Sequence, residues 1–184
     1  MLNIESTDFK DLLVINHEIF DDNRGFFFES YNKKLFDSAL NKDIYFVQDN
    51  NSFSNQGVIR GLHFQLKTPQ AKLVRVANGS ILDVVVDLRE DQPSFLNFFT
   101  IELSRSNRKM LWVPEGFAHG FQVLSKNALV CYKTTEFWSK DDEYTLRYDD
   151  PTLNIPWKDI KTIISDKDAN GKDLKEITKI LKTS

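Results

Sequence analysis

Short β-prone segments, separated by turn-forming residues, recur along most of the chain at intervals of roughly 8–12 residues. A first short strand is expected within residues 11–20. Further cases are residues 44–51, 72–76, 80–88, 97–103, 110–113 and 129–135, which are rich in β-branched and aromatic side chains. Helical patterns are confined to residues 32–40 and to the C-terminal tail, where Leu174, Ile177, Ile180 and Leu181 share one side. The sequence therefore predicts an all-β fold, an antiparallel sandwich or jelly roll with a few short peripheral helices.

The 184 residues fit a single domain, 1–184, because they can bury a core and contain no repeat, low-complexity segment or internal linker. A net charge of -3 argues against a nucleic-acid-binding surface, so an anionic ligand needs a local cluster of Arg and Lys. The single cysteine, Cys131, excludes an internal disulfide. No apolar run approaches ~18 residues and no signal peptide is recognisable, so we expect a cytoplasmic protein without a membrane partner.

Three local patterns give structural expectations. Asn78-Gly79, between two β-prone segments, is typical of a tight β-hairpin. In the second of these segments, Asp83 alternates with apolar residues on a mixed face, where it is either solvent-exposed or part of a pocket wall. Asn32 suits the N-cap of the helix predicted to run through Leu40.

Unusual side chains concentrate in GVIRGLHFQLKTPQAK, residues 57–72. Arg60 and Lys72 flank His63 and disfavour its protonated form, which predicts a neutral base near pH 7. The alternative is a half-buried histidine that only stabilises a strand edge. No metal is expected, because His63 and His119 lack the spacing of a local metal motif and the two cations would repel a metal ion.

The candidate groups suit proton transfer. His63 would be the base, Tyr132 a possible acid, and a carboxylate such as Asp168 or Asp83 would orient the imidazole. Aromatic rings could stack on a nucleobase. Four cations are available to hold phosphates, namely Arg24, Arg60, Lys72 and Lys167.

Several motifs resemble, in order along the chain, those of the dTDP-4-dehydrorhamnose 3,5-epimerase family. They are DDNRGFFFESYN, FVQDN, RGLHFQ, Pro-x-Ala-Lys-Leu-Val at 69–74, VPEGFAHGF, YKTTEFW and SDKDANG. The resemblance implies a cupin-type β jelly roll, a homodimer without metal or cofactor, and a dTDP-sugar substrate. It further implies inversion of C3 and C5 of dTDP-4-dehydro-6-deoxy-D-glucose, giving dTDP-4-dehydro-L-rhamnose for cell-surface polysaccharide.

The same resemblance assigns roles to individual residues. His63 would remove each proton, Asp168 would orient its ring, Tyr132 would return a proton to the opposite face, and Lys72 would stabilise the enolate oxygen. Gln48 and Asn50 would meet the thymine edge, and the cations the diphosphate. The full substrate-binding set comprises Arg24, Glu29, Gln48, Asp49, Asn50, Arg60, Lys72, His119, Trp138, Glu143 and Lys167.

Trp138 departs from the family pattern, which more often has tyrosine or phenylalanine stacking against the thymidine. This departure keeps open a relative that inverts one carbon or takes another 4-keto nucleotide sugar. A third alternative, from the fold alone, is a non-catalytic or metal-dependent jelly-roll binding module.

The assigned roles also make a geometric demand. In a regular strand, Arg60 and His63 point to opposite faces, so they can serve one site only where the strand bends or bulges. Gly61 lies between them, and we therefore predict irregular backbone at Gly61 with both side chains converging on the barrel interior.

Overall fold

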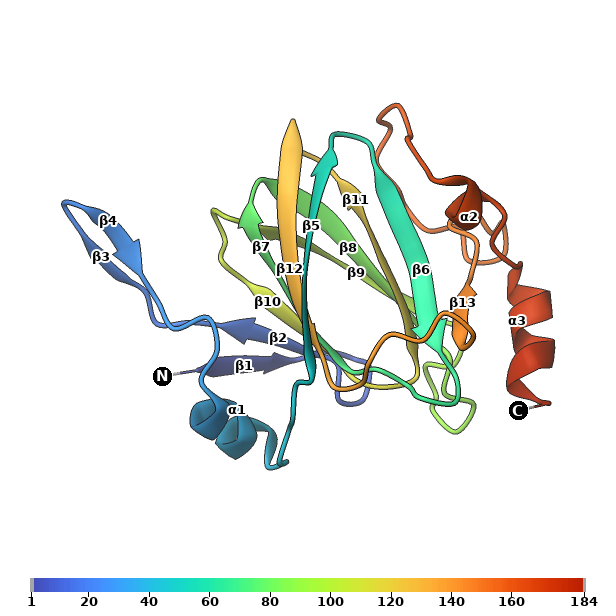
Figure 1. The fold of residues 1–184 in the computed structure, drawn as a ribbon, viewed down its shortest axis with the longest axis horizontal. Coiled ribbons are helices and arrows are strands. Elements are labelled where there is room, and N and C mark those ends of the chain that lie inside the picture. The colour runs from blue at the N-terminus through green and yellow to red at the C-terminus, as the bar shows by residue number, and fades with distance from the viewer. Residues whose placement is uncertain (1, 184) are drawn as a thin grey trace.

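Two facing antiparallel sheets carry most of the strands in a computed structural model that describes residues 2–183 (Figure 1). The arrangement is a cupin-type jelly roll, which confirms the predicted fold class. The first sheet has the order β1 (Asn3–Ser6), β2 (Leu13–Asn16), β10 (Met110–Val113), β7 (Lys72–Asn78), β12 (Asn127–Thr134) and β5 (Gln48–Asn55). The second has the order β13 (Glu143–Thr145), β6 (Ile59–Gln65), β11 (Phe117–Val123), β8 (Ser80–Asp87) and β9 (Phe98–Ser104).

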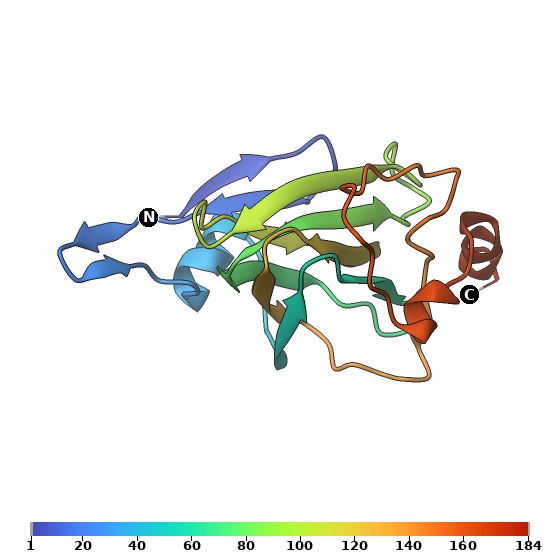
Figure 2. The same ribbon diagram turned by 90° about the horizontal axis from the view of Figure 1, so that it is seen from above.

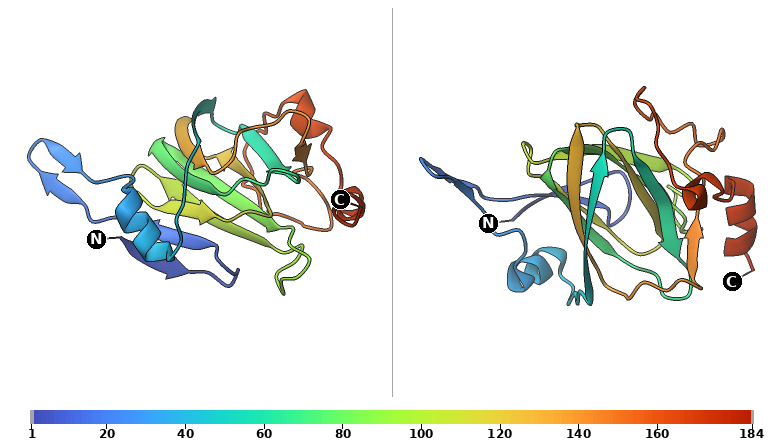
Figure 3. Two further views of the ribbon diagram at one scale, coloured as in Figure 1. Left: turned by 60° about the horizontal axis from the view of Figure 1, so that its bottom comes forward. Right: turned by 45° about the horizontal axis from the view of Figure 1, so that its top comes forward.

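The remaining elements are peripheral. A hairpin of β3 (Phe20–Asp22) and β4 (Gly25–Phe27) projects from one side of the sheets (Figure 2). The helix α1 (Lys33–Leu40) lies on that side too, and Asn32 caps it as predicted, accepting a hydrogen bond from the backbone of Leu35. The helices α2 (Asp166–Ala169) and α3 (Leu174–Leu181) lie at the opposite end (Figure 3). None of the helices within residues 2–183 is long and apolar enough to cross a membrane.

The core divides into layers that explain this arrangement. Between the sheets, Val74, Val85 and Phe121 belong to one buried cluster, to which both sheets contribute. On the outer side of the second sheet, Val84 packs in a separate cluster with Ile177 of α3. The strand β8 is therefore buried on both faces, and the amphipathic C-terminal helix predicted from the sequence covers part of it.

The predicted hairpin at Asn78-Gly79 is wrong. Strands β7 and β8 lie in different sheets, where β7 pairs with β10 and β12 while β8 pairs with β11 and β9. Only Gly79 separates the two strands, which is too short for a two-residue hairpin loop. Its positive φ of 80° serves a sharp passage from one sheet to the other, and a Cβ atom there would lie 2.1 Å from the carbonyl oxygen of Asn127.

The first strand, expected between residues 11 and 20, is shorter, since β2 covers only Leu13–Asn16 and pairs with a separate strand β1. The strand expected at 44–51 is shifted and forms β5, Gln48–Asn55. Both differences arise because the bounds of a strand follow its pairing partners, which a single sequence does not reveal.

The predicted irregularity at Gly61 is confirmed. The pairing of β6 with β11 shifts register between His119 and Phe121, opposite Gly61, which has a φ of 103° and is followed by a cis peptide bond. As a result, Arg60 and His63 line the same cavity.

Gly61→Ala is expected to lower the free energy of unfolding by about 3 kcal/mol or more. A Cβ atom at this position would lie 2.6 Å from the carbonyl oxygen of His119 and 2.8 Å from Cα of Gly120, in addition to the unfavourable φ. Urea unfolding of Gly25→Ala provides the matched control, since Gly25 has a φ of 131° with nothing within 4 Å of the added carbon. That variant should lose only about 1–2 kcal/mol. Equal losses would contradict the tight approach of β6 to β11.

Candidate active site

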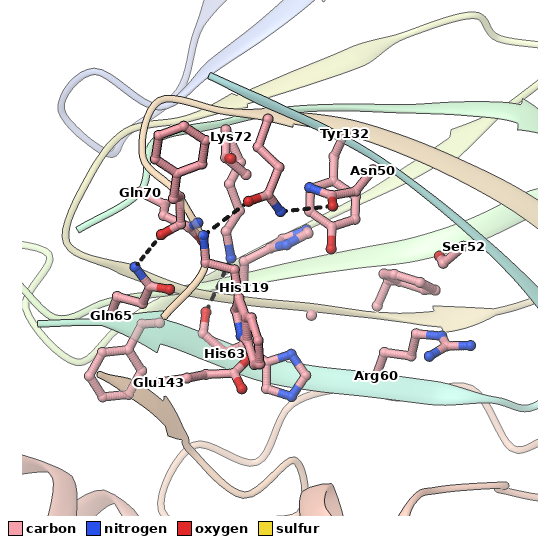
Figure 4. A pocket seen from close by; sticks show the side chains of 17 residues that line it. Asn50, Ser52, Arg60, His63, Gln65, Gln70, Lys72, His119, Tyr132 and Glu143 are labelled. Atoms are coloured by element: carbon pink, nitrogen blue, oxygen red, sulfur yellow. Dashed lines mark hydrogen bonds between the residues drawn. The ribbon is translucent and has the colours of Figure 1, made fainter. Parts of the chain in front are cut away.

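A cavity of about 490 Å³ lies between the two sheets (Figure 4). Its walls come from β5, β7 and β12 on one side and from β6, β11 and β13 on the other. The lining residues are Gln48, Asn50, Ser52, Arg60, His63, Phe64, Gln65, Gln70, Lys72, His119, Gly120, Phe121, Tyr132, Thr134, Phe137, Trp138 and Glu143.

His63 is held by a carboxylate from the C-terminal segment. Its Nε2 lies 2.6 Å from Oδ1 of Asp168, whose Oδ2 accepts a hydrogen bond from the backbone N–H of Gly61. Burial tends to raise the pKa of Asp168, but the hydrogen bonds from His63 and Gly61 outweigh it and the pKa is lowered. Asp168 is thus an ionised acceptor, so we assign the proton of neutral His63 to Nε2, which leaves Nδ1 with a free lone pair.

Lys72 is a desolvated cation beside this histidine. Its side chain is buried, and Nζ donates to the backbone carbonyl oxygen of His63 over 3.3 Å. Burial lowers the pKa of Lys72 to about 8, although the charges of Glu143 and Asp83 oppose that shift. A positive charge in so dry a position is suited to stabilising negative charge that develops in the cavity.

Tyr132 faces the cavity from β12, in the sheet opposite His63. Burial, and then the nearby charge of Glu143, raise the pKa of its phenol. The phenol therefore stays protonated at neutral pH. One wall of the cavity thus offers a proton acceptor and the facing wall a proton donor.

A second histidine–carboxylate pair joins a lining residue of the cavity to a buried carboxylate. His119 lines the cavity, and its Nε2 lies 2.9 Å from Oδ1 of Asp83. Asp83 is fully buried, so the exposed alternative for this residue is wrong. Of the two carboxylates considered for His63, Asp168 contacts it, whereas Asp83 orients His119.

At the open side, Glu143 lines the cavity and pairs with Lys167, which lies beyond the lining residues. Burial tends to raise the pKa of Glu143, but Lys167, His63 and the Trp138 side chain lower it. Trp138 and its neighbour Phe137 are 53% and 63% exposed, so two aromatic rings border the entrance.

Besides Lys167, three predicted substrate-binding residues lie outside this cavity. Asp49 points away because side chains alternate along β5, and it pairs with Lys133 at 2.6 Å. Arg24, in the turn of the projecting hairpin, is bound to Asp22 with 85% of its side chain exposed. Glu29 accepts a hydrogen bond from Asn32, away from the cavity.

Several lining residues escaped the sequence reasoning, among them Ser52, Gln65 and Gln70. Ser52 could have been found, because it lies two and four residues after Asn50 and Gln48 and therefore shares their face of a strand. Gln65 had the same signal, because it lies two residues after His63, whereas Gln70 had none. Within residues 2–183, no group of three or more His, Cys, Asp or Glu side chains is placed to hold a metal ion.

Comparison with known proteins gives a consistent family. The sequence profile described as dTDP-4-dehydrorhamnose 3,5-epimerase matches residues 6–176. The chain is 46% identical over 171 residues to the dTDP-4-dehydrorhamnose 3,5-epimerase of Shigella flexneri, covering 92% of this chain and 94% of the relative.

Solved structures agree with this result. A Legionella pneumophila dTDP-6-deoxy-D-glucose-3,5-epimerase in complex with dTDP-4-keto-L-rhamnose has a TM-score of 0.94 at 41% identity, covering 98% of this chain and 97% of that chain. A 3'-monoepimerase from Streptomyces bikiniensis in complex with dTDP-quinovose has a TM-score of 0.89 at 26% identity, covering 95% and 89%.

Lys72→Met is expected to stabilise the protein at pH 7 by up to about 3 kcal/mol, since the folded-state pKa of about 8 lies below the ordinary 10.5. The cost of burying the charge is complete below pH 8. It disappears as the pH rises toward 10.5, because the unfolded chain binds more protons in that interval. Between pH 8 and 10.5, the free energy of unfolding of the wild-type protein should therefore contain a contribution that increases with pH. The Lys72→Met variant should lack this contribution.

Urea unfolding between pH 6 and 10 measures both effects. Lys133→Met is the control, since Lys133 forms an exposed pair with Asp49 on the neighbouring strand and should change stability by less than about 1 kcal/mol. A destabilised Lys72→Met variant with a wild-type pH slope would contradict the buried charge.

Proposed function

We propose that this chain, which belongs to the dTDP-4-dehydrorhamnose 3,5-epimerase family, inverts C3 and C5 of dTDP-4-dehydro-6-deoxy-D-glucose to give dTDP-4-dehydro-L-rhamnose. The observation that carries the proposal is the placement of His63, backed by Asp168, across one cavity from Tyr132. Inversion at carbon needs a proton acceptor on one side of the sugar and a proton donor on the other.

The reaction follows from the position of the C4 ketone. C3 and C5 both adjoin it, so removing either proton sends the electron pair of the C–H bond into an enolate with its charge on the C4 oxygen. Nδ1 of His63 accepts the proton, and Asp168 stabilises the imidazolium that forms. Tyr132 then delivers its phenolic proton to the opposite face as the enolate returns to the ketone. Release of the His63 proton to solvent and reprotonation of Tyr132 restore both groups.

Lys72 acts on the enolate rather than on the proton. Its buried ammonium group, beside His63, is placed to stabilise the developing oxyanion. Losing one such preorganised donor commonly costs about 10²–10³ in kcat.

The nucleotide end is recognised by charge and stacking. Arg60 lines the cavity, and its Nε is fixed by the hydroxyl of Ser54 at 2.9 Å, which leaves the guanidinium nitrogens for the diphosphate. Trp138 at the entrance supplies an aromatic face for the thymine. Lys167 and Glu143 border the same end.

A homodimer would account for the position of Arg24 outside the cavity. Within residues 2–183 the β3–β4 hairpin pairs only with itself, and it exposes Phe20 and Phe27, at 55% and 65%. An isolated two-stranded hairpin is marginally stable, and exposed aromatic residues mark contact surfaces. A second copy of the chain that covers this hairpin would bring Arg24 toward the partner's cavity.

In heavy water, the wild-type protein should incorporate deuterium from solvent at two sugar carbons of dTDP-4-dehydro-6-deoxy-D-glucose, as measured by mass spectrometry. His63→Ala should abolish this exchange, because no other lining group occupies its position beside Asp168. Absence of exchange in a folded wild-type protein would exclude the proposed reaction for this substrate.

Tyr132→Phe separates the two half-reactions in the same assay. Exchange should persist because His63 still removes and returns the proton on one face, whereas inversion should slow by about 10²-fold or more. Normal inversion by this variant would remove Tyr132 from the mechanism.

A monoepimerase, or an epimerase of another 4-keto nucleotide sugar, is the second candidate. It is favoured by Trp138 at the entrance and by the likeness to the Streptomyces bikiniensis 3'-monoepimerase. Deuterium at a single carbon would support it over double inversion.

Mixing two inactive variants tests the proposed dimer. If the hairpin of one subunit completes the cavity of the other, Arg24→Ala and His63→Ala subunits should regain activity when unfolded and refolded together, because one site per mixed dimer is intact. Lack of recovery, with dimers confirmed by sedimentation, would place Arg24 at its own subunit's site or at none.

A further inference from the structure

Gln65 is a buried cavity residue that the proposed mechanism does not use. It lines the cavity from β6, two residues after His63, and only 5% of it is exposed (Figure 4). A buried amide needs hydrogen-bond partners for both its nitrogen and its oxygen. The hydrogen bonds of the Gln65 side chain reach two segments, the turn that follows β6 and the aromatic segment 137–139 at the entrance.

The orientation of the Gln65 amide follows from its partners. Its nitrogen faces the carbonyl oxygens of Thr68 and Phe137 at 2.7 and 3.2 Å, and these oxygens can only accept. Its oxygen accepts a hydrogen bond from the backbone N–H of Ser139 over 2.8 Å, and that group can only donate. Exchanging the two ends of the amide would break all three hydrogen bonds. One side chain therefore holds the entrance segment at a carbonyl and at an N–H two residues apart.

Asp142 fixes the same segment again three residues later. Its Oδ2 accepts hydrogen bonds from the backbone N–H groups of Lys67 and Thr68 at 3.0 and 2.8 Å, and from the Thr68 hydroxyl at 2.8 Å. Burial tends to raise the pKa of Asp142, but these hydrogen bonds outweigh it and the pKa is lowered. The turn after β6 and residues 137–142 thus form one hydrogen-bonded unit, in which Gln65 lines the cavity and Asp142 does not.

Trp138 lies between the two backbone groups that Gln65 holds. Its own backbone N–H donates to the Gln48 side chain in the facing sheet over 3.0 Å. The backbone of Trp138 is therefore held from both sheets, by β6 through its two neighbours and by β5 directly. Because the segment is fixed before a ligand arrives, little conformational freedom is lost when a ligand stacks on the ring.

We propose that Gln65 is a positioning residue that fixes the entrance segment relative to His63, so that the Trp138 ring is in place to receive the nucleobase of the substrate. The inference rests on the proposed function for the identity of the ligand. Gln65 acts through Trp138 and not on the reacting carbons. It couples the nucleotide end of the site to the strand that carries the base, so its loss should weaken binding and spare proton transfer.

Gln65→Leu removes all three hydrogen bonds at similar side-chain size. Calorimetric titration with dTDP should show about 10-fold weaker binding, because the ligand must then order the freed ring. KM for dTDP-4-dehydro-6-deoxy-D-glucose should rise by a similar factor. In contrast, kcat for solvent deuterium exchange should change by less than about 3-fold, since the contact of His63 with Asp168 is kept. A loss in kcat larger than the rise in KM would overturn the proposal.

Gln122→Leu is the matched control. Gln122 is also buried and holds a loop with both ends of its amide, donating to the carbonyl oxygen of Lys158 over 3.0 Å and accepting its N–H over 2.8 Å. It does not line the cavity. This variant should lose stability yet bind dTDP as the wild-type protein does. Equal losses of dTDP affinity in both variants would assign the effect to lost stability and overturn the proposal.

A double variant separates positioning from direct contact with the ligand. In a Trp138→Ala background the ring is already gone, so adding Gln65→Leu should weaken dTDP binding by less than about 2-fold. A further loss of about 10-fold in that background would mean that Gln65 acts on the ligand by another route, which contradicts its action through Trp138.

Hydrogen exchange of the ligand-free protein tests the proposed constraint without any ligand. Amides of residues 137–142 should exchange at least about 10-fold faster in Gln65→Leu than in the wild-type protein or in Gln122→Leu, because the segment opens locally more often. Unchanged exchange in Gln65→Leu would overturn the proposal. If the wild-type protein binds no dTDP, the proposed function fails, while faster exchange confined to Gln65→Leu still supports Gln65 as the residue that fixes the entrance.

Discussion

The close approach of β6 to β11 at two glycines is the constraint on which the site depends. A Cβ atom on Gly61 would meet the backbone of His119 and Gly120, and one on Gly120 would lie 2.4 Å from the carbonyl oxygen of Arg60. Neither strand can therefore carry a side chain at this crossing. The contact allows the register shift that brings His63 and Arg60 to one cavity, and it aims the N–H of Gly61 at Asp168. Backbone packing, not a loop, thus sets the geometry of the proposed base.

Around that contact, buried charge is balanced by long-range pairs rather than by neighbours in sequence. Asp168 holds His63 from a separation of 105 residues, and Asp83 holds His119 from 36. Both histidines are therefore oriented by carboxylates that their own strands do not contain. Lys72 has no carboxylate within hydrogen-bonding distance among the residues described, and burial lowers its pKa although the charges of Glu143 and Asp83 oppose that shift. The site thereby keeps a buried cation without a directly bonded carboxylate, which suits an anionic ligand or intermediate.

The fold class, the capped first helix, the amphipathic last helix and the break at Gly61 could be predicted, because each depends on local spacing or on one unusual residue. The hairpin at Asn78-Gly79 was wrong, since the same dipeptide can turn a chain back on its sheet or pass it to the facing sheet. The neighbouring strands with which each segment pairs decide between these outcomes. Among the candidate residues, alternation along β5 explains why Gln48 and Asn50 face the cavity and Asp49 does not.

The sequence by itself determined the chemical inventory: a histidine between two cations, a tyrosine, paired amides on one strand, and the motifs that identify the family. Its periodicities also determined that strands would dominate. Only the tertiary structure decided which carboxylate holds which histidine, that the Gln48 side chain accepts a hydrogen bond from Trp138, and that Arg24 lies outside the cavity. The physical reason is that these relations join residues far apart in the chain. Local propensity determines the conformation of each segment, whereas sheet order and packing determine which segments meet.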